Sequence, residues 1–181
     1  VFIKDIIERK RIERQDVLEQ ILDLLCSSVG SLTNPTKITN TLKSKNQTEI
    51  SVNTVKAYID HLEDAFLFSE SKRYDVRGKY YCEDVGLRNA RLGFRQQEMP
   101  HIMENILYNE LVVRGYAVDV GVVFSREKDS KGTALRVPRE IDFVATLGSK
   151  KVYIQSAYAM MTEEKMASEL KPFSLTGDSF P

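Results

Sequence analysis

The chain has 181 residues, of which 42% are hydrophobic and 29% are charged, as is ordinary for a globular protein that buries a core. Its 26 lysine and arginine residues balance its 26 aspartate and glutamate residues, so no global excess of positive charge draws it to nucleic acid or an anionic membrane. Any nucleic-acid contact must therefore come from a local patch. The two cysteines, Cys26 and Cys82, show no metal-ligand spacing, which argues against zinc and a disulfide framework and fits a reducing compartment.

The apolar runs and the first residues bear on localisation. No run approaches the roughly 18 apolar residues that a membrane-spanning helix needs, and charges come too early in VFIKDIIERKRIERQ for the apolar core of a signal peptide. We therefore expect a cytoplasmic protein with no membrane partner. Because the chain begins at Val1 rather than methionine, we interpret it as a fragment or as a sequence whose start is not shown.

Three amphipathic segments predict three helices in the first third of the chain. QDVLEQILDLLCSSVG has apolar side chains at helical spacing and ends in glycine. The second segment offers Thr33 or Asn34 as its N-cap and has Pro35 at the first helical position. The third begins at Ser51 and repeats apolar residues at spacings of three and four.

Strand-like residues on either side of the turn signal Arg77-Gly78 predict a β-hairpin after the third helix. Three short helices followed by a hairpin favour a winged helix-turn-helix domain over residues 10–84. The basic, glycine-containing stretch VGLRNARLGFRQQEMP follows, and we interpret it as a connector with one helical turn.

In the remaining residues, 98–181, helical and strand-like patterns follow one another, which predicts a small α/β domain. HIMENILYNELVVRG has a helical stripe, YAVDVGVVFSRE reads as a strand, and KDSKGTAL is a polar loop. Two further strands flank the turn Gly148-Ser149, and a final helix begins at Thr162 and stops at Pro172. The predicted fold class is α+β, with two domains of different design.

Carboxylates in this second domain suggest a metal site. The period of two residues in a strand places Glu140 and Asp142 on one face, and Gln155 with Ala157 on one face of the next strand. Hydrolysis of a phosphodiester with Mg²⁺ needs oxygen ligands and a nearby cation. Asp142 and Glu104 would be the carboxylate ligands, and the backbone carbonyl after Gln155 or the Gln155 side chain would complete the site. In the plainer alternative, Glu140 and Asp142 are solvent-facing strand residues paired with basic neighbours.

Glu104 on a helix, an acidic residue before Asp142 on a strand, and Gln155 on the next strand together resemble the core of the PD-(D/E)xK restriction-endonuclease-like fold. The stretches KYYCEDVGLRNA, MENILYNELVVRGYAVDVG and EIDFVATLGSKKVYIQSAY resemble the C-terminal region of a group of bacterial and archaeal AAA+ ATPases, called domain of unknown function 4143. The resemblance implies an ATPase module upstream that would bind ATP and Mg²⁺. This chain has no GxxxxGK[ST] motif, so we expect no cofactor in it.

The sequence departs from the nuclease pattern at Ala157, where active members of the fold have a lysine. The resemblance therefore implies a vestigial nuclease without activity of its own. A relocated lysine, Lys150 or Lys151, would instead give an Mg²⁺-dependent nuclease, which is the alternative function. The ending KPFSLTGDSFP is similar to the approach to one more strand in the family, which implies a sheet that is incomplete at its C-terminal end.

Basic residues gather in the predicted wing and connector, where they could bind a nucleic-acid backbone with tyrosines Tyr74, Tyr80 and Tyr81 interleaved for stacking. The alternative is a solvated hairpin whose tyrosines cover the core. The third helix has mostly acidic polar positions, which would repel phosphates. The candidate nucleic-acid-binding residues are Lys72, Arg73, Arg77, Lys79, Arg88 and Arg91.

The function that these observations favour is a non-catalytic accessory region of an AAA+ ATPase. It would contact its own ATPase module, another protein, or nucleic acid without reading the base sequence. A stand-alone transcription regulator is disfavoured by the acidic third helix.

Overall fold

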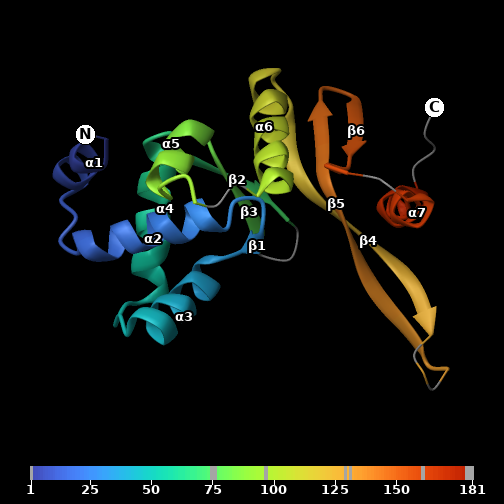
Figure 1. Ribbon diagram of the computed structural model, residues 1–181, viewed down its shortest axis with the longest axis horizontal. Helices are drawn as coiled ribbons and strands as arrows, with labels where there is room; N and C mark the ends of the chain where they lie inside the picture. Colours follow the sequence, from blue (N-terminus) through green and yellow to red (C-terminus); the bar gives the residue numbers. More distant parts are fainter. Residues whose placement is uncertain are drawn as a thin grey trace. The chain divides into compact units, whose positions relative to one another are not determined.

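The computed structural model describes residues 2–73, 77–95, 98–128, 130, 132–159 and 162–177. In these residues the chain forms seven α-helices and two three-stranded antiparallel sheets (Figure 1). The predicted mixture of helices and small sheets is confirmed at this level. The chain divides into two compact units, Val1–Asn105 and Ile106–Pro181.

The first unit contains five complete helices, three strands and the start of a sixth helix. The helices are α1 (Phe2–Lys10), α2 (Gln15–Ser27), α3 (Pro35–Asn46), α4 (Val52–Asp64) and α5 (Val85–Arg91), and the strands are β1 (Leu32–Thr33), β2 (Phe68–Lys72) and β3 (Gly78–Cys82). Helix α6 (Met99–Val113) spans the division between the units.

Local sequence signals explain the starts of α3 and α4. The side chain of Asn34 accepts a hydrogen bond from the backbone N–H of Lys37, and Pro35 occupies the first helical position. The Ser51 side chain accepts from Thr54 N–H in the same way. These predicted caps are confirmed, with Asn34 rather than Thr33 beginning α3.

Two helices of this unit were not expected from the sequence. Helix α1 precedes the predicted domain boundary at residue 10. Helix α5 replaces much of the predicted connector: the Asp84 side chain caps it by accepting from Leu87 N–H, and the helix packs against α2. The segment after the hairpin is therefore part of the first unit.

Strand β3 is the central strand of the first sheet, in the order β1-β3-β2. It is buried along its whole length, whereas β2 is buried only in part. One hydrophobic core joins α1 to the inner faces of α2, α3 and α4 and to both strands of the hairpin. Its centre is formed by fully buried residues such as Leu18, Ile21, Leu42 and Leu62.

The second unit is built on the strands β4 (Ala117–Lys128), β5 (Ala134–Leu147) and β6 (Lys150–Ile154), in the order β4-β5-β6. Helix α7 (Glu163–Leu170), capped by Thr162 as predicted, and the 3-10 helix η1 (Phe173–Leu175) follow. The predicted turn at Gly148 joins β5 to β6, with φ of 60° at the glycine.

A β-bulge interrupts the pairing of β4 with β5 between Asp119 and Gly121. A Cβ atom on Gly121 would approach Val144 Cγ2 to 2.8 Å and Ile141 Cβ to 2.9 Å, so the close approach of the strands requires glycine there. Beyond the bulge the two strands continue as a long hairpin. In the described part of the chain, no helix combines the length and the apolar character needed to cross a bilayer.

Candidate functional site

A groove of about 520 Å³ lies beside helix α4 in the first unit. The start of α3, the exposed side of α4 and the β2–β3 hairpin line it, so it occupies the position between the third predicted helix and the predicted wing. Its charged lining residues are Lys56, Asp60, Glu63, Glu70, Lys72, Arg73 and Arg77.

The carboxylates reach the groove from two elements. Asp60 and Glu63 lie one turn apart on α4, and Glu70 is on β2. A hydrogen bond from Glu70 N–H to Glu63 Oε1, at 3.1 Å, ties the end of α4 to this strand. The phenol of Tyr80 donates to Glu70 Oε1 at 3.4 Å, so the floor of the groove is also tied to this carboxylate.

The pKa values of two groups in the groove are raised by burial first and by neighbouring carboxylates second. Burial is the first cause that raises the pKa of Glu63 above its ordinary value, and the neighbouring Glu70 is the second. Burial also raises the pKa of the Tyr80 phenol, and Glu70 and Glu63 raise it further.

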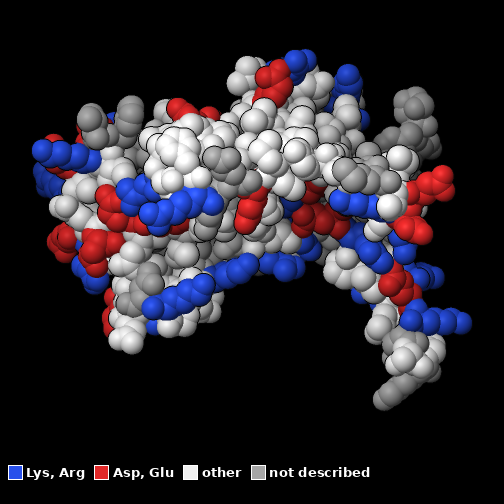
Figure 2. All heavy atoms as spheres, viewed as in Figure 1, with Lys and Arg blue, Asp and Glu red and all other residues white. Residues whose placement is uncertain are grey.

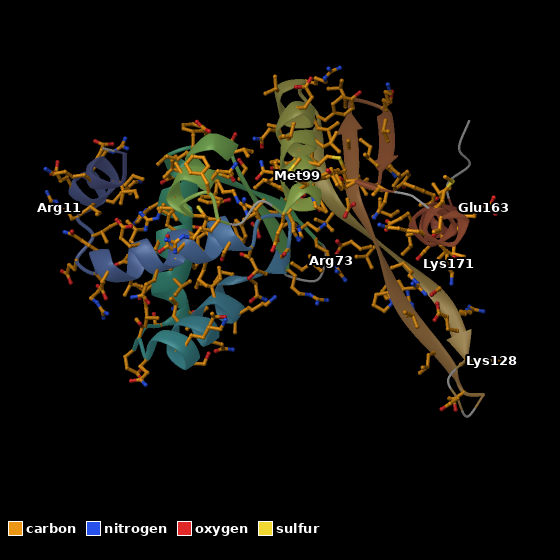
Figure 3. The ribbon with its side chains drawn as sticks, viewed as in Figure 1. Arg11, Arg73, Met99, Lys128, Glu163 and Lys171 are labelled. Carbon is orange, nitrogen blue, oxygen red and sulfur yellow. The ribbon has the colours of Figure 1, made fainter. Side chains whose placement is uncertain are left out.

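Three of the predicted nucleic-acid-binding residues lie at this groove. Lys72 ends β2, Arg73 follows it, and Arg77 precedes β3, with Arg73 N–H bonded to the Arg77 carbonyl at 3.0 Å. Figure 3 shows Arg73 at the end of the strand, and Figure 2 shows Lys and Arg side chains in a row from α3 towards this turn. Tyr74, predicted to stack, lies outside the described residues.

The other three predicted residues hold the first unit together. Arg88 is 1% exposed, and its Nε donates to the Cys26 carbonyl at 2.9 Å. Arg91 forms ion pairs with Glu19 and Asp23 on α2. The tyrosines Tyr80 and Tyr81 are buried, so their rings are not available for base stacking.

Lys79, the sixth predicted residue, belongs to a buried polar cluster. Its Nζ lies 2.9 Å from Glu104 Oε1, and the Tyr81 hydroxyl donates to the same oxygen at 2.7 Å. On the next residue of α6, the Asn105 side chain accepts from Cys82 N–H at 2.8 Å and donates to the Cys82 carbonyl at 2.7 Å. These bonds attach the start of α6 to β3.

The predicted metal ligands fall in both units. Glu104 is in the first unit, where Lys79 and Tyr81 bind its carboxylate, whereas Asp142 and Gln155 are in the second. Gln155 Oε1 accepts from Asp142 N–H at 3.3 Å, and Asp142 Oδ2 accepts from Ser156 N–H at 2.9 Å. Gln155 Nε2 also donates to Glu169 of α7 at 3.1 Å.

The structure therefore brings Asp142 of β5 and Gln155, which follows β6, side by side. Their hydrogen bonds attach the end of β6 to β5. Among the described residues, no group of three or more His, Cys, Asp and Glu side chains has a geometry that could hold a metal ion.

Sequence reasoning missed the contribution of Glu70 to the groove. The spacing of Lys56, Asp60 and Glu63 along one helical face was visible in the sequence. The burial of Lys79 and Arg88 was not, because it depends on β3 being central and on α5 packing against α2.

Two comparisons with known proteins bear on the family. Residues 1–98 match the model of a family described as Domain of unknown function (DUF8612). A protein of Haemophilus influenzae with the name "Uncharacterized protein" is 37% identical over 166 residues, which cover 87% of this chain and 38% of that protein. No solved structure matches the chain.

These findings correct the resemblance to domain of unknown function 4143 and the AAA+ ATPases. The matching family model is a different one, and the name of the relative refers to no ATPase. The short stretches behind that resemblance, such as KYYCEDVGLRNA, cover structural elements here: part of β3 and the capped start of α5. The chain spans 38% of the length of the relative that it matches.

Proposed function

The chain belongs to the DUF8612 family, whose description states no activity, and we propose from its geometry that it is a non-catalytic interaction module. Its first unit binds a polypeptide segment of mixed charge in the groove beside α4. The observation that carries this proposal is the joint lining of the groove by Asp60, Glu63 and Glu70 and by the cations of the β2–β3 turn.

We infer that the first unit is a winged helix. The order of α2, β1, α3, α4 and the β2–β3 hairpin supports this, as does the sheet order β1-β3-β2. In that fold α4 would be the recognition helix and the hairpin the wing. DNA-reading members present cations there, because phosphates dominate the affinity for DNA. Here Asp60, Glu63 and Glu70 stand among the cations of the groove, which favours a polypeptide of mixed charge over a phosphate backbone.

We infer that the second unit is nuclease-like but not catalytic. The order α6, β4, β5, β6, α7 supports the likeness. One feature supports the lack of catalysis: Ala157 stands where active members of the fold have a lysine.

The absence of nuclease activity is tested directly. The purified chain is incubated with plasmid, linear duplex and single-stranded DNA in Mg²⁺ and in Mn²⁺, beside an Asp142→Ala variant. We expect no cleavage by either protein. Cleavage by the wild type that disappears in Asp142→Ala would contradict the proposal.

The groove is tested with a displayed library of random peptides, followed by affinity measurements on the enriched sequences. We expect peptides with required lysine or arginine positions. Their affinity should fall about tenfold or more in Asp60→Asn/Glu70→Gln. The matched control Glu13→Gln/Glu49→Gln neutralises two exposed carboxylates of the same unit that do not line the groove, and should bind as the wild type does.

Two results would contradict the groove as a peptide site. One is a library without enriched peptides. The other is a set of enriched peptides that bind Asp60→Asn/Glu70→Gln as tightly as the wild type. Displacement of the peptides by duplex DNA would show that the groove prefers nucleic acid and would also overturn the proposal.

A further inference from the structure

The β4–β5 hairpin of the second unit extends beyond its third strand. Strand β6 pairs only with Phe143–Leu147 of β5, whereas β4 pairs with β5 as far as Lys128 opposite Ala134. In the described residues, the outer part of the hairpin is therefore a two-stranded ribbon (Figure 1). Lys128 lies towards its far end (Figure 3).

One face of this ribbon is exposed and basic. Cross-strand partners share a face of a sheet, which places Phe124, Arg126 and Lys128 with Pro138, Arg136 and Ala134. Arg126, Lys128 and Arg136 are exposed, and Phe124 is half-buried. We call this the cationic face: Phe124, Arg126, Lys128, Ala134, Arg136 and Pro138.

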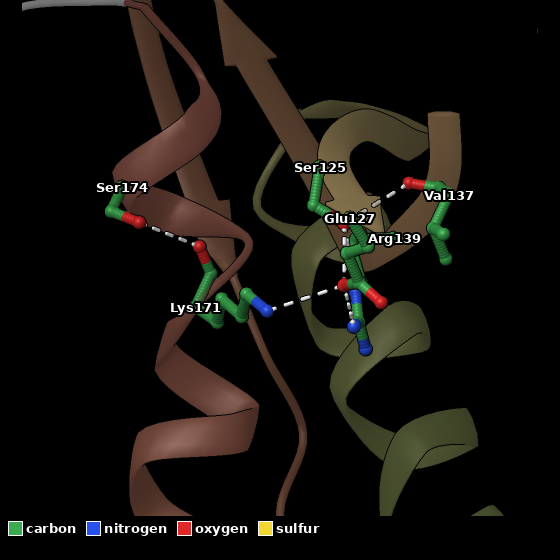
Figure 4. A network of polar contacts seen from close by, with 6 residues as sticks. All are labelled: Ser125, Glu127, Val137, Arg139, Lys171 and Ser174. Atoms are coloured by element: carbon green, nitrogen blue, oxygen red, sulfur yellow. Dashed lines mark hydrogen bonds and ion pairs between the residues drawn. The ribbon is translucent and has the colours of Figure 1, made fainter. Parts of the chain in front are cut away.

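The opposite face of the ribbon is partly covered, and its carboxylate is paired with cations. Glu127 is on this face, where it forms ion pairs with Arg139 and Lys171 and accepts from the Ser125 hydroxyl at 2.8 Å (Figure 4). Lys171 follows α7, and η1 lies against β4. Because the Glu127 carboxylate is paired with Arg139 and Lys171, it forms no ion pair with the described cations of the other face.

The cationic face contains a pair of like charges. Arg126 and Arg136 are directly opposite each other in the strand register. Like charges in this position destabilise an antiparallel pair. The Arg136 guanidinium lies 3.8 Å from the centre of the Phe124 ring, which orients it over the strand. A bound anion would relieve the repulsion.

The shape and spacing of the face fit a polyanion. A hollow of about 470 Å³ is lined by Phe124, Arg126, Ala134, Leu135 and Arg136. Arg126 and Lys128 are two residues apart, a rise of about 6.8 Å along a strand, which is close to two base-pair rises of about 3.4 Å. The nearest carboxylate on this face, among the described residues, is Glu140 at its inner end, opposite Val122.

We propose that the cationic face of the β4–β5 hairpin binds duplex DNA through the phosphate backbone, without reading its sequence. A two-stranded ribbon fits the major groove, which is about 12 Å wide. Arginine is suited to phosphate because its planar guanidinium donates two parallel hydrogen bonds. This site lies in a different unit from the peptide groove, so either can fail without the other.

The test is a titration of a labelled duplex of about 20 base pairs followed by fluorescence anisotropy at several salt concentrations. The variant is Arg126→Ala/Arg136→Ala in the full chain. The matched control is Lys43→Ala/Lys45→Ala, which removes two exposed cations from α3 of the first unit. Polyglutamate serves as a competitor that has negative charge, as DNA does, but no major groove. Circular dichroism checks that the variants fold.

We expect Arg126→Ala/Arg136→Ala to weaken binding about tenfold or more and to reduce the salt slope by about 1.8, the value for two lost phosphate contacts. The control should bind within about twofold of the wild type. Polyglutamate should displace the duplex only at a concentration at least about tenfold above that of unlabelled duplex.

Three results would overturn the proposal: unchanged affinity in Arg126→Ala/Arg136→Ala, an equal loss in the control, or displacement by polyglutamate as effective as by duplex DNA. The last result would identify the face as a site for acidic protein segments. If Arg126→Ala/Arg136→Ala does not fold, Arg126→Gln/Arg136→Gln decides by the same criteria.

Discussion

In the first unit Lys79, Arg88 and Arg91 bind to the protein itself, whereas in the second unit Arg126 and Arg136 lie exposed on one face of a hairpin. All five occur in stretches that are similarly rich in basic residues. The difference arises from the strand or helix that holds each residue: β3 is the central strand of its sheet, and the outer part of the β4–β5 hairpin is covered on one face only. A cluster of cations in a sequence therefore predicts a nucleic-acid site only once the covered faces are known.

Replacing the buried Lys79 by methionine should have the largest effect on the stability of the first unit. Removal of one partner leaves the Glu104 carboxylate buried without that cation, which costs about 3–5 kcal/mol in the free energy of unfolding. Urea denaturation measures it. The double variant Lys79→Met/Glu104→Leu should recover much of the loss, because a buried ion pair is often replaced by apolar residues without cost.

A loss below about 1 kcal/mol in Lys79→Met would contradict the structural role of this lysine. It would return Lys79 to the list of residues available for binding.

Replacing Arg88 by methionine should have the next largest effect. The Cys26 carbonyl loses a buried donor, which costs about 1–3 kcal/mol. The matched control is Arg95→Met, an exposed arginine beyond α5, which should change stability by less than about 0.5 kcal/mol. Equal stability of the two variants in urea denaturation would show that Arg88 is not a structural residue.

The contacts of Glu127 should make the covered face of the hairpin sensitive to acid. Hydrogen bonds from Arg139, and then from Ser125 and Lys171, lower the pKa of Glu127 from 4.5 to about 2. The stabilisation from a lowered carboxyl pKa is complete above the unfolded value and is lost as the pH falls through the folded one. Wild type should therefore be more stable than Glu127→Gln above pH 4.5.

This difference between wild type and Glu127→Gln should close as the pH falls from 4.5 towards 2, in thermal melts at matched pH. A difference that stays constant across this range would show that the Glu127 carboxylate does not depend on these partners.

Neutralising the cationic face should have the smallest effect on stability. Arg126→Ala/Arg136→Ala should change the free energy of unfolding by less than about 0.5 kcal/mol, with any gain arising from relief of the like-charge pair. Chemical denaturation measures it. A large loss would place these arginines with Lys79 and Arg88 and remove the contrast between the units.

The sequence predicted the elements that local signals determine. Asn34, Ser51 and Thr162 cap helices where expected, and Gly148 makes the turn between β5 and β6. The stretch that contains α5 was interpreted as a connector with one helical turn because it is basic and contains glycines, although Asp84 was a readable cap.

Burial of charged residues could not be predicted in this way. Lys79 is in β3, which pairs with its hairpin partner β2 on one side and with the distant β1 on the other, so its exposure depends on the sheet order. The cationic face had a readable signal, since Phe124, Arg126 and Lys128 alternate with Ser125 and Glu127. The pattern becomes interpretable only when the structure shows that η1 and Lys171 lie against the other face.

The contrast between the two units is tested most directly by NMR, with backbone amide shifts of the full chain followed during titration with duplex DNA. The account predicts that the shifts concentrate at residues 124–128 and 134–138, while α4 and the residues around Arg73 and Arg77 change little. Shifts that concentrate on α4 and the β2–β3 hairpin, with the β4–β5 hairpin unchanged, would contradict it.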